Sequence, residues 1–385
     1  MKIALIAAST IPARTANSIQ VMKMAQALAG LDHQVRVYVP GISPGVGWPQ
    51  LAAHYGLGEQ QAFSLQWLPA LARLRRYDYG LRAVQRARRW GADLIYTRLP
   101  QAAAFASWSA FPTIFEIHDL PQGSMGPRLL RTFLRGRGAR GLVTITDALA
   151  AALMDGFPIS SVPHLLYIAP DGVDLDRYKD LPAPDQARAA LNLPEGFTVG
   201  YTGHLYPGRG IDLILKLAAQ LPQINFLLAG GEPQDVARVQ GQARSAGLSN
   251  LNLLGFVPNA DLPRYQAACD VLLMPYQKKV AASSGGDISA FLSPMKMFEY
   301  LACGRAILAS DLPVLQEVLS SDNAVILPAA DESAWVTALQ TLQSDAAYCR
   351  SLAAQARLTA QKYTWHARAA AILRLLPPAQ HISAG

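Results

Sequence analysis

One glutamate, Glu299, lies inside the otherwise apolar stretch at residues 290–311, AFLSPMKMFEYLACGRAILASD. Pro294 suits the first turn of a helix because it has no N–H to lose, and Gly304 suits the end of one. The stretch therefore predicts a loop, a helix, a glycine and a buried strand. The first N–H groups of such a helix, together with the positive end of its dipole, form a place for phosphate. The alternative is a core helix whose single acid reaches solvent.

A second stretch, GYTGHLYPGRG at residues 200–210, indicates the same ligand. It follows an apolar run that predicts a strand and precedes residues 211–221, IDLILKLAAQL, which predict a helix. Its glycines permit a tight turn and a close approach of the backbone. Arg209 would then lie at the N-terminus of a helix, where its forked guanidinium could bind a diphosphate. An ordinary connection between a strand and a helix is the alternative.

Residues 116–120, EIHDL, follow the apolar run FPTIF and place an acid, a histidine and an acid at the end of a predicted strand. Site residues gather at the carboxyl ends of strands in parallel sheets. His118 and Asp119 could bind a pair of sugar hydroxyls or share a proton. A lone histidine at a strand end is more often a structural hydrogen bonder. No second His or Cys lies at the spacing of metal ligands, so we expect no metal.

The first apolar run, MKIALIAAS, leads into a polar loop at residues 9–18 and not into the glycine pattern G-x-G-x-x-G. That pattern marks dinucleotide binding when it follows a first strand, so its absence disfavours an NAD-dependent dehydrogenase. The N–H groups of the loop could still bind an acceptor or a phosphate. A plain connection explains the loop equally well.

Apolar, strand-like runs alternate with helix-period segments through both halves of the chain. Strands that are apolar on both faces and separated by helices indicate a parallel sheet covered on both sides. The fold class predicted is therefore α/β, with two doubly wound domains. The least structured join, DLDRYKDLPAPDQ at residues 174–186, is rich in proline and charge and marks the predicted domain boundary.

The composition is that of a well-buried globular protein, with 51% hydrophobic and 16% charged residues. No apolar run is long enough to cross a bilayer, and the N-terminus becomes polar too soon for a secretory signal. Three widely spaced cysteines exclude a disulfide framework and any ordinary zinc spacing. We therefore expect a reduced, cytoplasmic protein.

The net charge of +7 is unevenly distributed. Residues 1–170 carry 17 Lys and Arg against 8 Asp and Glu, with arginines clustered at residues 73–89 and 128–140. Solvated helix faces are one explanation, and an anionic membrane surface or a phosphate-bearing acceptor is the other. We expect no nucleic-acid partner, because no recognised binding module accompanies the charge.

With these stretches in order, the chain resembles the retaining glycosyltransferases of the GT-B fold, the group 1 or family 4 class. The resemblance covers nearly the whole chain and is specific for the class, but it says little about substrate. It rests on EIHD at 116–119, APDGVD at 169–174, VGYTGHLYPGRGIDLIL at 199–215, LLAGGEP at 227–233, LLGFVP at 253–258 and SPMKMFEYLACGRAILASD at 293–311.

The resemblance implies two Rossmann-like domains that face each other across a cleft. Residues 1–175 would form the acceptor-side domain and residues 176–360 the donor domain. Residues 361–385 would form a helix that crosses back onto the first domain. The reaction implied is transfer of a sugar from a nucleotide-diphosphate sugar, a UDP- or GDP-sugar, to a hydroxyl acceptor, with retention and without metal or other cofactor.

The same resemblance implies roles for individual residues. Glu299 matches the glutamate that binds the ribose hydroxyls, Arg209 the basic residue on the diphosphate, and His118 the histidine that orients the transferred sugar. The donor-binding residues would be Gly203, His204, Arg209, Phe256, Val257, Ser293, Pro294, Met295, Lys296 and Glu299. On the acceptor side the candidates are Thr10, Arg14, Asn17 and Asp119.

Two positions depart from the family pattern. His204 stands where many relatives have a second arginine, which leaves one fixed charge in place of two. Phe291 stands where the E-x7-E motif has its first acid, and the chain resembles the subset of the class with S-P-x-K-x-F-E-Y there. Asp287 could partly replace the missing acid.

Two other functions remain open on the sequence. One is a sugar-nucleotide 2-epimerase of the same fold, and the other is a non-catalytic protein that binds a sugar nucleotide or a carbohydrate. The acceptor expected for a transferase is a lipid-linked glycan, a polysaccharide or a small molecule. A lipid-linked acceptor would suit the basic first domain, whose helix at residues 128–135 interleaves leucine and arginine and could lie on the anionic inner face of the membrane.

Overall fold

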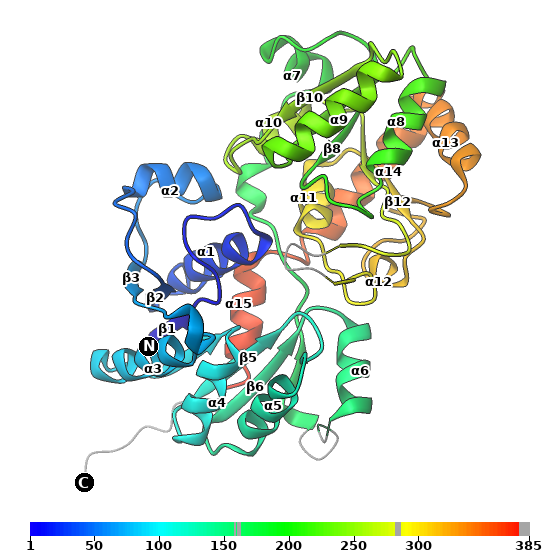
Figure 1. Ribbon diagram of the computed structural model, residues 1–385. Helices are drawn as coiled ribbons and strands as arrows, with labels where there is room; N and C mark the ends of the chain where they lie inside the picture. Colours follow the sequence, from blue (N-terminus) through cyan, green and yellow to red (C-terminus); the bar gives the residue numbers. More distant parts are fainter. Residues whose placement is uncertain (158, 160–162, 282–285, 377–385) are drawn as a thin grey trace. The chain divides into compact units, whose positions relative to one another are not determined.

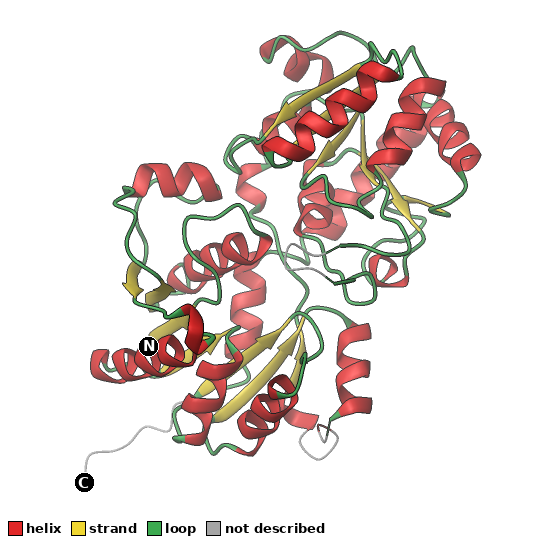
Figure 2. Cartoon of the chain, in the orientation of Figure 1, coloured by secondary structure: helices red, strands yellow, loops and turns green. Residues whose placement is uncertain are grey.

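The computed structural model describes residues 1–157, 159, 163–281 and 286–376, which form two compact units (Figure 1). The first unit comprises Met1–Pro170 and the segment that begins at Trp365, and the second comprises Asp171–Thr364. Each unit has one parallel sheet with helices packed around it (Figure 2). The predicted fold class, two doubly wound α/β domains, is thereby confirmed. The assignment of an acceptor side to residues 1–175 and a donor side to residues 176–360 stays a prediction.

The first unit has the strand order β3-β2-β1-β4-β5-β6-β7, with parallel neighbours throughout. The order reverses between β1 and β4, and ligands of such sheets bind off the carboxyl ends of the strands at this point. The elements are β1 Lys2–Ile6, α1 Ala16–Ala29, β2 Gln34–Pro40, α2 Trp48–Tyr55, β3 Ser64–Leu68, the 3-10 turn Ala72–Leu74, α3 Tyr77–Trp90, β4 Leu94–Thr97, α4 Pro100–Trp108, β5 Thr113–Ile117, α5 Met125–Arg135, β6 Ala139–Thr144, α6 Asp147–Gly156, the 3-10 turn Pro163–Leu165, β7 Leu166–Ile168 and α15 Trp365–Leu373.

The second unit repeats the plan with the order β10-β9-β8-β11-β12-β13, again parallel. Its core holds fully buried Leu217, Phe226 and Trp335. The elements are the 3-10 turn Leu175–Arg177, α7 Pro184–Ala190, β8 Thr198–Thr202, α8 Ile211–Gln220, β9 Asn225–Ala229, α9 Pro233–Ser245, β10 Leu251–Gly255, α10 Leu262–Ala267, β11 Val271–Met274, α11 Met295–Cys303, β12 Ala306–Ser310, α12 Pro313–Gln316, β13 Val325–Leu327, α13 Glu332–Ser344 and α14 Ala346–Ala360.

The C-terminal helix α15 belongs to the first unit although the chain reaches it through the second. It packs against α1, as Figure 1 shows for the red helix beside the blue one. This confirms the crossing expected for a helix after residue 361. Residues 377–385, the end of that predicted segment, lie outside the described residues.

The sequence does not predict β3, which pairs with β2. Three of its side chains are half-buried and Ser64 is exposed, so the strand lacks the continuous apolar run that marks strands buried on both faces. Strand β3 lies at the end of the sheet order, where one face and one edge meet solvent more often.

Gly304 ends α11 in the left-handed conformation, with φ +62. A Cβ added there would lie 2.1 Å from Nε of Arg357 on α14. Gly304→Ala should therefore destabilise the second unit by about 1–3 kcal/mol, because the backbone conformation is strained for any L side chain and Arg357 must move. Urea unfolding followed by circular dichroism measures this loss.

Gly241→Ala is the matched control for this prediction. Gly241 lies within α9, and a Cβ there has nothing within 4 Å. The control should be neutral or gain up to about 1 kcal/mol from better helix propensity. Equal unfolding midpoints for the two variants would contradict the proposed strain at Gly304.

Candidate functional site

Helix α11 lies against the carboxyl end of β8 in the second unit. Pro294 precedes its first residue, and Phe298 and Tyr300 are fully buried. The backbone N–H of Thr202, the last residue of β8, donates to the hydroxyl of Tyr300 at 2.7 Å. Since this bond fixes the helix against the strand end, it also fixes Lys296 and Glu299 on the same helix. The predicted order of loop, helix, glycine and buried strand is confirmed.

The loop after β8 turns on Gly208 and Gly210, both with φ +81. A Cβ on Gly208 would lie 2.0 Å from the carbonyl oxygen of Lys279, and one on Gly210 would lie 1.9 Å from that of Pro275. Only glycine allows the loop to approach the segment after β11 this closely. The predicted connection from strand to helix is therefore a tight turn packed against a second segment.

Arg209 extends from this loop onto Tyr276. Its Nη1 donates to the Tyr276 hydroxyl at 3.3 Å, and its Nη2 donates to the carbonyl of Ala281 at 3.4 Å. The centre of the guanidinium lies 5.3 Å from the centroid of the Tyr276 ring. The buried Nε of Arg209 has no hydrogen-bond partner among the described residues. The guanidinium is thus oriented by weak contacts and keeps donor capacity for a ligand.

A second cation, Lys296, lies beside Arg209. The Nζ of Lys296 is 3.7 Å from the centroid of the Tyr201 ring and 5.7 Å from that of Tyr276. It is buried and has no hydrogen-bond partner within the described part of the chain. Burial and then the charge of Arg209 hold the pKa of Lys296 well below its usual value, while Glu299 raises it. Arg209 and Lys296 both lie over the Tyr276 ring, and Lys296 and Glu299 are on the same helix, α11, so the three side chains belong to one region of the second unit.

Glu299 is held by two amides. Nδ2 of Asn259 and Nε2 of Gln266 each donate to a different oxygen of its carboxylate at 3.4 Å. Asn259 is in turn bound by Arg177, which donates to the Asn259 side-chain oxygen at 2.8 Å and to its carbonyl. A carboxylate that only accepts hydrogen bonds suits a diol, and both of these bonds are long.

The remaining donor-side candidates surround these residues in the second unit. The ring of His204 stacks on Tyr206 with centroids 4.6 Å apart, and Tyr201 donates to the His204 carbonyl at 2.6 Å. Gly203 has φ +133, and a Cβ there would lie 2.8 Å from Nζ of Lys296. The others are the buried Ser293 and the adjacent Pro294 and Met295 at the start of α11, with Phe256 and Val257 in the loop after β10.

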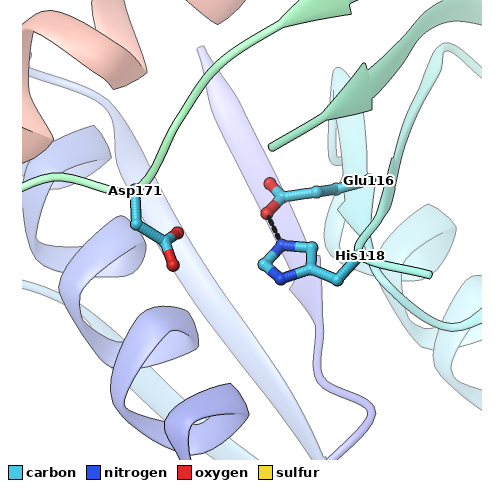
Figure 3. Close-up of side chains that lie close together, drawn as sticks. All are labelled: Glu116, His118 and Asp171. Carbon is cyan, nitrogen blue, oxygen red and sulfur yellow. Dashed lines mark hydrogen bonds and ion pairs between the residues drawn. The ribbon is translucent and has the colours of Figure 1, made fainter. Parts of the chain in front are cut away.

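In the first unit, β5 carries Glu116 and leads into His118. The Glu116 side chain is fully buried and that of His118 is 18% exposed. Figure 3 shows the Glu116 carboxylate bonded to the imidazole, through Nε2. Figure 3 also draws Asp171, which is the first residue of the second unit.

The charge states of this pair differ. Burial alone would raise the pKa of Glu116, but Arg368 and the hydrogen bond with His118 lower it to about 2. Burial, followed by the charge of Arg98, lowers the pKa of His118 to about 4 against the opposite influence of Glu116. At neutral pH the site therefore holds an ionised carboxylate and a neutral imidazole.

The loop after β1 is fixed by side chains from later elements. The backbone N–H of Ala13 donates to the Tyr55 hydroxyl at 2.8 Å, and Trp67 donates to the carbonyl of Ile11 at 3.2 Å. Thr10 and Arg14 are exposed, while Asn17 is half-buried in the first turn of α1. Asp119 accepts from the N–H of Leu120 at 2.7 Å and so stabilises the turn after β5.

A cavity of about 340 Å³ lies beside the glycine loop of the second unit, lined by Tyr206, Lys216, Asp235, Arg238 and Glu332 among others. Arg209, Lys296 and Glu299 do not line it. The cavity is therefore separate from the candidate site at these three residues.

Two family models cover the two halves of the chain. The model for glycosyltransferase family 4 matches residues 18–177, and the model for glycosyl transferases group 1 matches residues 196–345. The chain belongs to the group 1, family 4 glycosyltransferases. Members of this family are retaining hexosyltransferases, and this glycosyltransferase uses a nucleotide-sugar donor.

Individual relatives agree with this assignment. The chain is 24% identical over 371 residues to a phosphatidyl-myo-inositol mannosyltransferase of Mycolicibacterium smegmatis, covering 92% of this chain and 88% of the relative. It is 27% identical over 301 residues to a 2-deoxystreptamine glucosyltransferase of Streptomyces kanamyceticus, covering 67% and 74%.

Solved structures show the GT-B fold. The sucrose-phosphate synthase of Thermosynechococcus elongatus superposes with a TM-score of 0.74 at 21% identity, covering 97% of this chain and 98% of that one. Anabaena HepE in complex with UDP-glucose gives a TM-score of 0.72 at 20% identity, covering 98% and 100%. The predicted family and fold of the glycosyltransferase are therefore confirmed.

The structure places Arg209, Lys296 and Glu299 in the second unit of this glycosyltransferase, and the sequence prediction depended most on Arg209 and Glu299. His118 and the loop at residues 9–18 belong to the other unit, so their meeting with the donor residues stays a prediction. Sequence reasoning missed the residues that hold the site in place. These are Glu116 and Arg368 in the first unit, and Arg177, Asn259, Gln266 and Tyr276 in the second.

The pKa shifts of Glu116 and His118 predict how the stability of the glycosyltransferase depends on pH. The pKa of His118 falls from 6.5 to about 4 in the folded chain, so the unfolded chain takes up this proton first as the pH falls. The free energy of unfolding should therefore decrease between about pH 6.5 and 4, by at most about 1.4 kcal/mol per pH unit for this one group. Glu116, with a pKa lowered from 4.5 to about 2, extends the loss to lower pH.

Urea unfolding between pH 7 and 4.5 checks this dependence. His118→Gln should flatten the slope between pH 6.5 and 4.5, whereas the same change at the exposed His366 should leave it unchanged. A slope in His118→Gln equal to that of the parent protein would contradict the burial of a neutral imidazole.

Proposed function

We propose that this glycosyltransferase transfers a hexose from a UDP- or GDP-sugar, without a metal ion, and that the second unit holds the donor. The observation that carries the proposal is the pair of cations at the carboxyl end of β8. Arg209 and Lys296 lie on the same tyrosine ring, and Lys296 has no hydrogen-bond partner among the described residues. A polyvalent anion such as a diphosphate would satisfy both.

Lys296 accounts for the departure at His204. The family resemblance leaves one fixed charge where many relatives have two, and the ammonium of Lys296 lies where it can supply the second. Burial and the charge of Arg209 lower its pKa, and the negative charge of an incoming diphosphate would raise it. The first N–H groups of α11, which begins beside Ser293 and Pro294, add a positive dipole end.

Glu299 would bind the ribose of the nucleotide. Its carboxylate can only accept hydrogen bonds, and its present bonds to Asn259 and Gln266 are both 3.4 Å long. Two ribose hydroxyls are donors of matching geometry. The glycosidic transfer itself would follow the retaining course of the family, in which the acceptor hydroxyl attacks from the face that the nucleotide leaves. The dominant stabilisation would then be that of the departing diphosphate by Arg209 and Lys296.

The transferred sugar would meet His118 from the first unit. Phe291 stands at the position of the first motif acid. The carboxylate of Asp287, the substitute suggested by the sequence, accepts from the N–H groups of Val280 and Ser289, both at 2.9 Å. These bonds give Asp287 a structural role in a turn. UDP-glucose is the first donor to test, because HepE was solved with it.

A donor-binding experiment tests this proposal. Arg209→Ala should lower turnover about a hundredfold or more, since one lost donor to the developing charge costs about 3–4 kcal/mol. Glu299→Ala should weaken binding of the free nucleoside diphosphate in calorimetry and raise the KM of the donor. Turnover is measured with a panel of UDP-, GDP- and ADP-sugars.

Lys278→Ala is the control, because Lys278 is exposed and follows the same strand, β11, as Tyr276. It should keep turnover and nucleotide affinity. Nucleotide affinity unchanged in Glu299→Ala would show that the nucleotide binds elsewhere. Nucleotide binding without transfer to any acceptor would favour the epimerase or the non-catalytic alternative.

We also propose that the first unit docks on anionic lipid, which suits a lipid-linked acceptor such as the one named for the mycobacterial relative. Among the described residues, no helix is long and apolar enough to cross a bilayer. The predicted lipid-facing helix at residues 128–135 is wrong in one respect. Leu129, Leu130 and Phe133 of α5 are buried inside the unit and Leu134 is half-buried, whereas Arg128, Arg131 and Arg135 are exposed.

The segment at residues 71–76, LARLRR, fits a lipid surface better. All six residues are exposed, and Leu71 and Leu74 are 41% and 42% exposed. Arginines alternate with exposed leucines here, so charge and apolar surface lie on the same short segment. Arg82, one turn into the following helix, donates to the carbonyl of Pro69 at 2.9 Å and so ties the segment to α3.

Arg73→Ala/Arg75→Ala/Arg76→Ala should weaken binding to phosphatidylglycerol vesicles about a hundredfold at low salt, since each basic residue near such a surface contributes about 1 kcal/mol. Co-sedimentation measures the bound fraction. The triple change of Arg128, Arg131 and Arg135 to Ala removes the same charge from α5 and should weaken vesicle binding less. An equal loss of vesicle binding in the two variants, or binding that does not depend on the charge of the lipid, would contradict docking through this segment.

A further inference from the structure

The first unit contains a buried polar cluster that joins the C-terminal helix to the strand end at His118. The carboxylate of Glu116 is 0% exposed and lies 3.0 Å from Nη2 of Arg368 on α15, whose side chain is 4% exposed. Tyr96 on β4 and Gln20 on α1 also donate to Glu116. Thus β4, β5, α1 and α15 all contribute to holding one carboxylate.

Arg368 does more than neutralise this charge. Its Nε donates to the carbonyl of Pro170 at 2.9 Å, and its Nη2 donates to that of Ala169 at 3.1 Å. Nη1 also lies 3.3 Å from the Tyr96 hydroxyl. A guanidinium with these partners has one orientation, and it holds Glu116 in one orientation as well.

An ionised carboxylate can only accept hydrogen bonds, so the imidazole of His118 must donate to it. The bonded atom is Nε2. A neutral imidazole with its proton on Nε2 presents a lone pair on Nδ1. The Nδ1 atom of this ring is therefore an acceptor, and the side chain is 18% exposed.

We propose that Glu116, fixed by Arg368, is a positioning residue that holds His118 in the Nε2-protonated tautomer, so that Nδ1 accepts a hydrogen bond from a substrate hydroxyl. This inference rests on the proposed function for the contact between His118 and a sugar. With this tautomer, Nδ1 can accept a hydrogen bond from an O–H group but cannot donate one to a substituent that only accepts. It also makes α15 part of the site, because the residue that fixes Glu116 comes from that helix.

A purely structural ion pair would have a different consequence. Loss of such a pair lowers stability but leaves the proton on His118 where it was. The tautomer of His118 and the turnover of the folded protein therefore separate the two explanations. Both are measured on the full chain.

The experiment uses protein labelled with ¹⁵N in its histidines and long-range ¹H–¹⁵N correlation spectra at pH 7. The His118 signals are assigned by their loss in His118→Gln. We expect a neutral ring with its proton on Nε2. In Glu116→Gln/Arg368→Met, which removes both buried charges together and so avoids leaving either unpaired, we expect mixed tautomers. Turnover should fall about ten- to a hundredfold, the usual effect of losing a residue that orients an active-site histidine.

The nucleotide affinity of the double variant should be unchanged, because Arg209 and Glu299 lie in the other unit. Arg188→Met/Asp270→Asn is the matched control, since Arg188 forms an ion pair with Asp270 at 2.9 Å in the second unit, with side chains 9% and 23% exposed. It should lower stability and leave both the His118 spectrum and the turnover per folded molecule as they were.

Three results would overturn the inference. They are a proton on Nδ1 in the parent protein, an imidazolium at pH 7, or an unchanged tautomer in the double variant. Parent-like turnover in His118→Gln would overturn the hydroxyl contact alone. The donor proposal would survive that result. It fails only if Arg209→Ala leaves turnover unchanged and Glu299→Ala leaves nucleotide affinity unchanged.

Discussion

The position of α11 in the second unit depends on one hydrogen bond between this helix and the end of a strand. Thr202 is the last residue of β8, and its backbone N–H donates a hydrogen bond to the hydroxyl of Tyr300. Because Tyr300 is buried, this bond fixes the rotation of α11 about its own axis. Lys296, one turn earlier, then lies over Tyr201, the neighbour of Thr202 in the strand. Glu299 is directed to Asn259 and Gln266 by the same constraint.

Two buried charged groups in this chain, Glu116 and Lys296, differ in whether the free-energy cost of their burial is compensated by hydrogen bonds. The carboxylate of Glu116 is fully buried and has Arg368, His118, Gln20 and Tyr96 as partners, so its burial is compensated inside the unit. The ammonium of Lys296 is buried beside another cation and has no hydrogen-bond partner among the described residues. An unsatisfied buried group costs on the order of 1–3 kcal/mol. Such a cost inside a folded protein is typical of a functional site, and it is the observation on which the proposed diphosphate site rests.

Much of the fold could be predicted from the sequence because its strands are apolar on both faces and its helices keep their period. The exception, β3, is an edge strand, and its half-exposed residues lack that signal. The position of Glu299 on a helix before a buried strand was equally predictable, since Pro294 and Gly304 mark the two ends of the helix. The partners of Glu299 were not predictable, because Asn259 and Gln266 approach it only through the packing of α10 against α11.

The partners of Glu116 were even harder to predict from the sequence. The motif EIHD indicates that His118 belongs to a site, yet nothing near it in the sequence points to Arg368. That residue reaches Glu116 only because α15 returns to the first unit after the whole second unit has been traversed. Contacts of this range depend on topology, which local patterns do not contain.

The amphipathic pattern of α5 shows why a surface function cannot be inferred from periodicity alone. Leucines alternating with arginines are expected both for a helix on lipid and for a helix that covers a protein core. In α5 the apolar side chains face the protein core, since Leu130 and Phe133 are buried. At residues 71–76 the same composition occurs without a buried face, because the segment is a short turn with all its side chains exposed. Exposure, and not the sequence pattern, therefore separates the two segments, and at residues 71–76 both the leucines and the arginines are exposed.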